Sequence, residues 1–132
     1  MQKIDFDEAV EALVRKDERY RIGAYHFLRD ALDHTLRKSR GEGQAEDRHV
    51  SGKELVHGIR EYALKEFGPM VMTVFEEWGI LSCADFGEIV FNLIEARVFG
   101  QTEDDRKEDF AGHYDFQEAF VEPFLPRDQV AR

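Results

Sequence analysis

The chain has 132 residues, of which 42% are hydrophobic and 35% charged, a balance typical of a globular domain. Its formal net charge is −10, with ten basic and eleven acidic side chains in residues 1–50 but eight and seventeen in residues 51–132. This acidic second part disfavours nucleic acids and anionic membranes as partners, because both are bound mainly through Lys and Arg. A single cysteine allows no internal disulfide and no apolar run approaches a membrane span, so we expect a cytoplasmic protein.

Helical signals appear from the start of the chain. A first helix is predicted to open at Asp5, whose side chain suits an N-cap. A second is predicted from about Tyr20 to Lys38, because apolar residues recur there at helical spacing. Residues 39–50 contain two glycines and many charges without periodicity, which is typical of a loop.

Three further helices are predicted to form a compact trihelical core over about residues 52–97. The first begins at a Ser51–Glu54 capping box, the second is short and ends at Gly79, and the third begins near Ser82. The core side chains are expected to be Ile59, Val74, Trp78, Phe86, Ile89, Val90 and Leu93.

The segment after this core allows two interpretations. Residues 97–99 and 111–116 could pair as a short β-hairpin, which would make the core winged-helix-like. The Thr102–Asp105 spacing instead favours a short helix through Phe110, and a last helix is predicted over 115–121. We therefore expect one mainly α domain over 1–132 with about five to six helices: an N-terminal pair over about 5–38, a loop over about 39–50, and the trihelical core plus a C-terminal segment over about 51–122.

Two surfaces are candidate binding sites. Phe91 and Asn92 lie off the apolar stripe of their predicted helix, so either the C-terminal segment buries Phe91 through Tyr114, Phe116 or Phe120, or a partner does. The possible partner surface comprises Phe91, Asn92, Glu95 and Phe99. A possible anion patch comprises Arg37, Lys38, Arg40 and Arg48, although solvated helix ends, where cations are favourable, are the simpler interpretation.

Candidate chemistry is sparse. His26, Asp30 and His34 share one helix face and could hold a divalent metal, but the core stripe of that helix lies elsewhere, so we expect this face to be solvated. Cys83 falls in the first turn of a predicted helix, where a thiolate would be stabilised, yet a buried filler is the simpler interpretation. No catalytic residue, metal site or cofactor is predicted.

Several stretches carry a family resemblance. They include Tyr25-His26-Phe27, His49-Val50-Ser51-Gly52-Lys53-Glu54-Leu55, Phe67-Gly68-Pro69-Met70, Trp78-Gly79-Ile80, Asp85-Phe86-Gly87-Glu88-Ile89-Val90-Phe91-Asn92-Leu93 and Tyr114-Asp115-Phe116. Together, over roughly residues 20–120, the chain resembles a family of conserved hypothetical bacterial proteins of about this length, uncharacterised in function. The resemblance implies a bacterial origin and a full-length domain, and it brings no activity or ligand.

These features favour a non-enzymatic protein–protein interaction domain. Its partner is expected to be another protein or a second copy of the chain, with the acidic C-terminal part as the contact face. A winged-helix-like nucleic-acid-binding or regulatory module is one alternative, although its recognition helix would be acidic. A metal-binding protein or enzyme that uses the surface histidines is the other.

Overall fold

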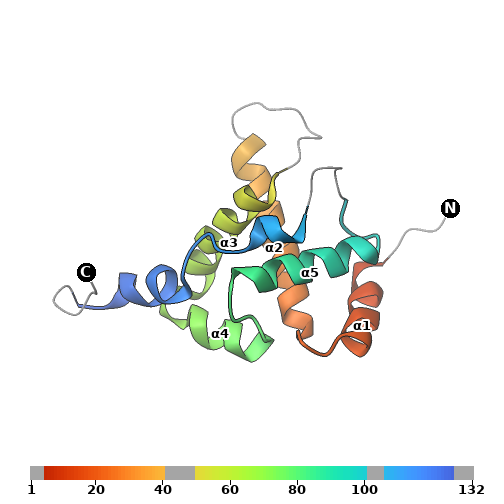
Figure 1. The fold of residues 1–132 in the computed structure, drawn as a ribbon, viewed down its shortest axis with the longest axis horizontal. Coiled ribbons are helices and arrows are strands. Elements are labelled where there is room, and N and C mark those ends of the chain that lie inside the picture. The colour runs from red at the N-terminus through yellow and green to blue at the C-terminus, as the bar shows by residue number, and fades with distance from the viewer. Residues whose placement is uncertain (1–4, 41–49, 101–105, 127–132) are drawn as a thin grey trace.

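The computed structural model describes residues 5–40, 50–100 and 106–126, and the side chains of residues 39 and 40 are not described. These residues form a mainly α structure, as predicted, with five α-helices, several short helical turns and no strand (Figure 1). The elements in chain order are α1 (Phe6–Lys16), α2 (Ile22–Arg40), α3 (Gly52–Phe67), η1 (Gly68–Met70), α4 (Val71–Trp78), α5 (Cys83–Glu95), η2 (Lys107–Phe110), η3 (Gln117–Val121) and η4 (Glu122–Phe124). None of the described helices is both long and apolar enough to cross a membrane.

Side-chain caps begin the helices where the sequence predicts them. The carboxylate of Asp5 accepts the amide of Asp7 at 3.1 Å and so caps α1. At α3 the capping box is complete, since Ser51 Oγ accepts the amide of Glu54 and the Glu54 carboxylate accepts the amide of Ser51. These bonds satisfy donors that the helix itself leaves free, which is why such short sequence signals fix helix starts reliably.

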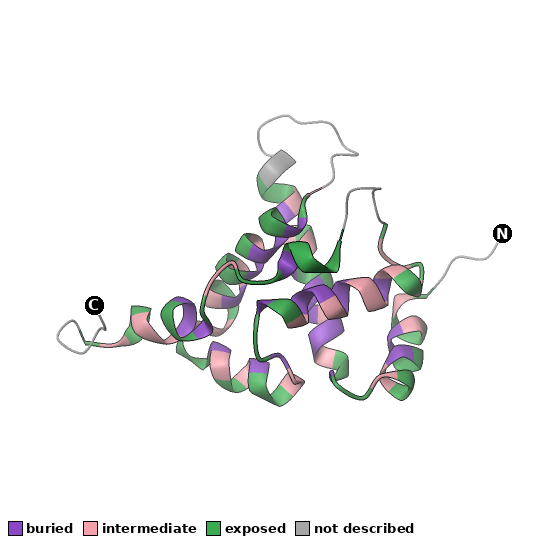
Figure 2. Cartoon of the chain, in the orientation of Figure 1, coloured by how far each residue is buried: buried purple, intermediate pink, exposed green. Residues whose placement is uncertain are grey.

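α2 is the central helix of the molecule. It contacts α1, α3, α4 and α5, and its side chains Tyr25, Leu28 and Ala31 are fully buried. Buried residues of all five α-helices, together with those of η2 and η3, form one hydrophobic cluster (Figure 2). The N-terminal helices therefore complete the core that α3, α4 and α5 begin.

The predicted core is confirmed at five of its seven positions. Ile59, Phe86, Ile89 and Leu93 are fully buried and Val90 is nearly so. Trp78 is half-buried and packs against this core, and the prediction is wrong for Val74, which is half-buried. The reason lies in α4, which turns Val71 and Phe75 inward, so that Val74 and Trp78 fall at the border of the buried face.

The C-terminal segment buries apolar side chains without forming a described strand. Of residues 97–116, Lys107–Phe110 is a short helical turn and residues 101–105 lie outside the described part, so the possible hairpin is not confirmed. Arg97 ends α5 in the left-handed conformation, with φ 66°. Its amide donates to Ile94 O and that of Val98 to Leu93 O, a helix end that normally carries glycine.

A tight junction joins the α4–α5 turn to the start of α2. Gly79 ends α4 with φ 89°, and a Cβ added there would lie 2.1 Å from the carbonyl oxygen of Arg19. A Cβ on Gly23 would lie 2.4 Å from the Trp78 ring, and the Arg21 amide donates to Trp78 O. The two segments can approach this closely because both glycines lack a side chain.

Candidate functional site

The predicted partner surface is mostly engaged within the molecule. The ring of Phe91 packs edge-to-face on Phe110 with centroids 6.4 Å apart, so the C-terminal segment does cover it, through a residue other than the three expected. Phe99 is half-buried and packs against the core. Asn92 is committed to hydrogen bonds, and only Glu95 of the four is exposed. The four residues thus present no exposed apolar patch.

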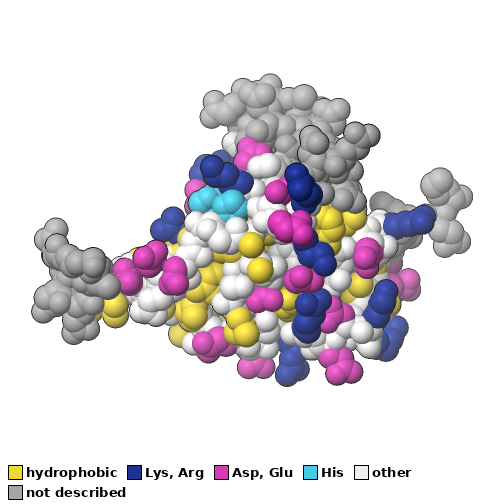
Figure 3. All heavy atoms as spheres, viewed as in Figure 1, with side chains coloured by type: hydrophobic (Ala, Val, Ile, Leu, Met, Phe, Trp, Pro, Cys, Tyr) yellow, Lys and Arg dark blue, Asp and Glu magenta, His cyan; other side chains and the backbone are white. Residues whose placement is uncertain are grey.

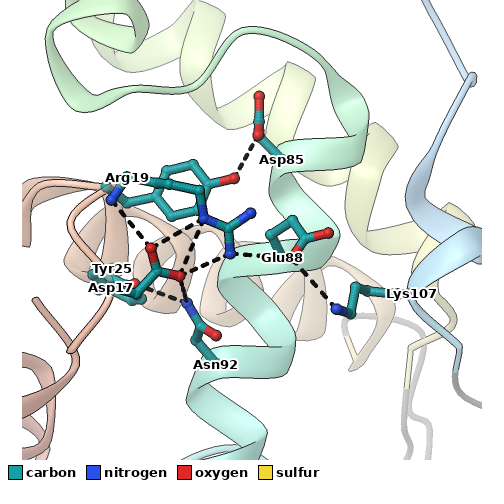
Figure 4. Close-up of polar contacts among 8 residues, drawn as sticks. Asp17, Arg19, Tyr25, Asp85, Glu88, Asn92 and Lys107 are labelled. Carbon is teal, nitrogen blue, oxygen red and sulfur yellow. Dashed lines mark hydrogen bonds and ion pairs between the residues drawn. The ribbon is translucent and has the colours of Figure 1, made fainter.

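A polar network accounts for Asn92 (Figure 4). Its side-chain amide donates to Asp17 Oδ2 and to the hydroxyl of Tyr25, both at 3.0 Å. Asp17 also accepts hydrogen bonds from Nε and Nη2 of Arg19, at 3.0 and 2.8 Å, and from the backbone amide of that residue. The Arg19 bonds chiefly hold the pKa of Asp17 well below its usual range, despite the opposing effect of partial burial. The α1–α2 connection is thereby fastened to α5.

Further bonds extend this network along α5. Arg19 reaches Glu88 at 3.2 Å, and Glu88 also pairs with Lys107 at 3.4 Å. The hydroxyl of Tyr20 donates to Asp85 at 2.5 Å, and the other oxygen of Asp85 accepts the amides at the start of α5. Each side chain labelled in Figure 4 forms at least one hydrogen bond or ion pair within the chain, so we interpret the network as structural.

Asp17→Asn is expected to lower the free energy of unfolding at pH 7 by about 1–2 kcal/mol, because charge-assisted bonds become neutral ones. A carboxylate with a lowered folded-state pKa stabilises the fold above its unfolded pKa of about 3.9 and loses that contribution as the pH falls through the folded value. The wild type should therefore lose more stability than the variant between about pH 4 and pH 2. Urea denaturation at several pH values measures both the loss of stability at pH 7 and the difference in acid sensitivity.

Asp30→Asn is the control for this prediction. Asp30 is half-exposed, and its contact with Arg29 is long, at 3.7 Å. This variant should keep the acid sensitivity of the wild type. An Asp17→Asn protein with the same acid sensitivity as the wild type would contradict the role given to Asp17.

The described members of the predicted anion patch are paired with acids. Arg37 bonds to Asp33 one turn earlier on α2, and Lys38 bonds to Glu61 of α3 at 2.5 Å. The side chain of Arg40 and all of Arg48 lie outside the described residues. Because Arg37 and Lys38 are paired with acids of the chain, they attract an external anion less strongly than the sequence suggests.

The histidine face of α2 lies between helices instead of facing solvent throughout. His26 packs on the ring of Phe6, with centroids 5.2 Å apart, and lies 3.6 Å from Asp7. His34 contacts Glu61 at 3.1 Å. Both imidazoles are half-buried, which corrects the prediction of a solvated face for the two histidines, whereas Asp30 is exposed as predicted. In the described part of the chain, no three His, Cys, Asp or Glu side chains converge in a way that could hold a metal.

Cys83 is buried, as its simpler interpretation requires. The residue is 3% exposed, and its thiol donates to the carbonyl of Tyr114 at 3.4 Å. Burial raises its pKa, against the weaker opposing effect of backbone hydrogen bonds. The thiolate that a nucleophile needs is therefore disfavoured.

One end of the molecule stands out by its charge, and we call it the acidic end. It comprises η1 and α4 (Gly68–Trp78) together with η3 and η4 (Gln117–Phe124), which lie against one another through Phe75 and Phe120. It carries four carboxylates, no Lys or Arg, and two large exposed apolar side chains. In Figure 3 magenta and yellow spheres lie together at the lower left, where part of this end faces the viewer. The carboxylates are Glu76, Glu77, Glu118 and Glu122, and the apolar side chains are Met70 and Phe124, 52% and 45% exposed.

The two parts of the acidic end lie within long stretches of sequence that contain no Lys or Arg. No Lys or Arg occurs from Glu66 to Ala96 or from Glu108 to Pro126. None of the four carboxylates is ion-paired within the described residues. The sequence does show these two cation-free runs, but only the fold reveals that parts of both meet at one end.

Comparisons with protein families, with curated proteins and with solved structures found no match for this chain.

Proposed function

We propose that this protein is an interaction domain that binds a basic, amphipathic segment of another protein at its acidic end. The proposal is carried by one observation: four unpaired carboxylates and two exposed apolar side chains share an end without cations. Lys and Arg of a partner would complement the carboxylates and set orientation and association rate, while apolar side chains would cover Met70 and Phe124.

The charges favour a basic protein over the other partners considered. Four carboxylates at one end without Lys or Arg repel one another in the free protein, and a basic partner relieves that repulsion. A second copy of the chain that docks through the same end would increase this repulsion. Nucleic acid is disfavoured because the carboxylates of the acidic end, and the exposed Glu95 of α5, a helix without Lys or Arg, would repel its phosphates.

Neutralising the acidic end is expected to weaken binding of a basic peptide about tenfold, because four exposed ion pairs at a few tenths of a kcal/mol each sum to about 1.4 kcal/mol. The probe is a labelled helical peptide of about 18 residues with Leu on one face and Lys on the other, compared with its Leu/Glu counterpart. Fluorescence anisotropy should show binding of the Lys peptide only, weakening as salt rises. The variant combines Glu76→Gln, Glu77→Gln, Glu118→Gln and Glu122→Gln.

A matched control separates the site from net charge. The control variant changes four acids on or near α1 and α2, and it takes the net charge from −10 to −6, as the first variant does. Its substitutions are Glu8→Gln, Glu11→Gln, Glu18→Gln and Asp30→Asn. The control should bind the Lys peptide nearly as well as the wild type. Met70→Ser with Phe124→Ser should also weaken binding. Equal loss in both charge variants, or equal binding of the Glu peptide, would refute the proposal.

A further inference from the structure

A pocket of about 530 Å³ lies between the last turns of α2 and the first half of α3. The two helices touch at Thr35 and Gly58, where a Cβ on the glycine would lie 1.9 Å from Thr35 Oγ1. The lining residues of α3 recur at helical spacing from Lys53 to Glu61, so they form a single wall. The volume is that of a small-molecule site, and the pocket lies apart from the acidic end.

Both carboxylates in the pocket wall are already occupied. Glu61 accepts a hydrogen bond from Lys38 at 2.5 Å and contacts His34 at 3.1 Å, and these two contacts lower its pKa. Glu54 completes the capping box of α3 by accepting the amide of Ser51 at 2.8 Å. The acids of the pocket therefore repel an incoming anion less than their number suggests.

Two nitrogen-bearing side chains in the wall have spare hydrogen-bonding capacity. Lys53 forms no ion pair, and His57 forms no hydrogen bond, with any described residue. The His57 ring lies edge-on to that of His113 and tilted against that of Tyr114, with centroids 5.8 and 5.9 Å apart. Partial burial, then His113, Lys53 and Arg60, lower the pKa of His57, which favours its neutral imidazole. Lys53 also lies in the first turn of α3, where the helix dipole is positive.

We propose that the α2–α3 pocket binds a small molecule that carries one carboxylate or phosphate group on an apolar body. The anionic group accepts hydrogen bonds from Lys53 and His57. The apolar body lies against Val50, the Thr35 methyl group and the alkyl chain of Lys38, which line the same space. This site is independent of the proposed partner surface, and either can fail without the other.

Titrations followed by NMR test this site with benzoate and phenyl phosphate as probes and benzyl alcohol as the neutral control. One or both anions should give saturable shifts at Thr35, Lys53 and His57, and should raise the pH at which His57 titrates, because a bound anion favours the imidazolium. The anion that binds more tightly shows whether the site prefers a carboxylate or a phosphate group. Benzyl alcohol should cause neither change.

Variants make the test specific. Lys53→Gln is expected to weaken binding of the better anion about tenfold, and His57→Gln should also weaken it. The control is Lys65→Gln, which removes an exposed charge on α3 outside the pocket and should leave the affinity unchanged. All three changes are at exposed positions, so the fold should be retained. No saturable shift with either anion, equal shifts with benzyl alcohol, or unchanged affinity in Lys53→Gln would each overturn the proposal.

Discussion

Gly79→Ala is expected to lower the free energy of unfolding by about 2–5 kcal/mol. A side chain in the left-handed conformation costs about 1–2 kcal/mol, and forcing extra atoms into a packed site costs about 1–3 kcal/mol more. Here the obstacle is the carbonyl oxygen of Arg19, 2.1 Å from the added carbon, and backbone yields less readily than a side chain. Urea denaturation followed by circular dichroism measures the loss.

Gly112→Ala separates the two costs. Gly112 also has a positive φ, 77°, but an added Cβ would meet nothing within 4 Å. Its alanine variant should therefore lose only about 1–2 kcal/mol, the conformational part. If both variants lost the same amount, the close approach of the α4–α5 turn to Arg19 would be wrong.

Phe75→Ala is expected to lose about 3–5 kcal/mol, a large part of the stability of a domain of this size. Phe75 is fully buried, and its ring lies within 6.4 Å of five other aromatic rings. These rings come from α2, α4, α5 and the C-terminal segment, so the cavity would open where four parts of the chain meet. The five rings are those of Phe27, Trp78, Phe86, Phe116 and Phe120.

Phe75→Leu is the volume-conserving control. It should cost much less than the alanine variant, because most of the buried volume is kept. Trp78, the single tryptophan, reports local packing by its fluorescence, since its ring lies 6.4 Å from that of Phe75. A stable Phe75→Ala protein with unchanged Trp78 emission would contradict the aromatic core described here.

The sequence predicted those parts of the fold that depend on neighbouring residues. Helix starts at Asp5 and Ser51 were predictable because the cap and the amide it accepts are two or three residues apart. The buried stripe of α5 was predictable because one helical period repeats over its length. The short α4 gave too few turns to fix its rotation, and Val74 was misplaced for that reason.

Contacts between distant residues could not be predicted in the same way. Asn92 was singled out as lying off the stripe, but its partner Asp17 is 75 residues away, between the first two helices. The half-buried histidines of α2 were missed because α1 and α3, not α2 itself, supply Asp7 and Glu61. The acidic end was likewise visible only as two separate runs without cations.

The most direct test of the proposed function is to map the Lys peptide on the surface by NMR. Amide shifts of the isotope-labelled protein should change most at and around Met70, Glu76, Glu77, Glu118 and Phe124, and these changes should disappear in the four-Gln variant. Shifts centred instead on α1 or on the Phe91–Phe99 surface, or shifts that persist unchanged in the four-Gln variant, would contradict the acidic end as the binding site.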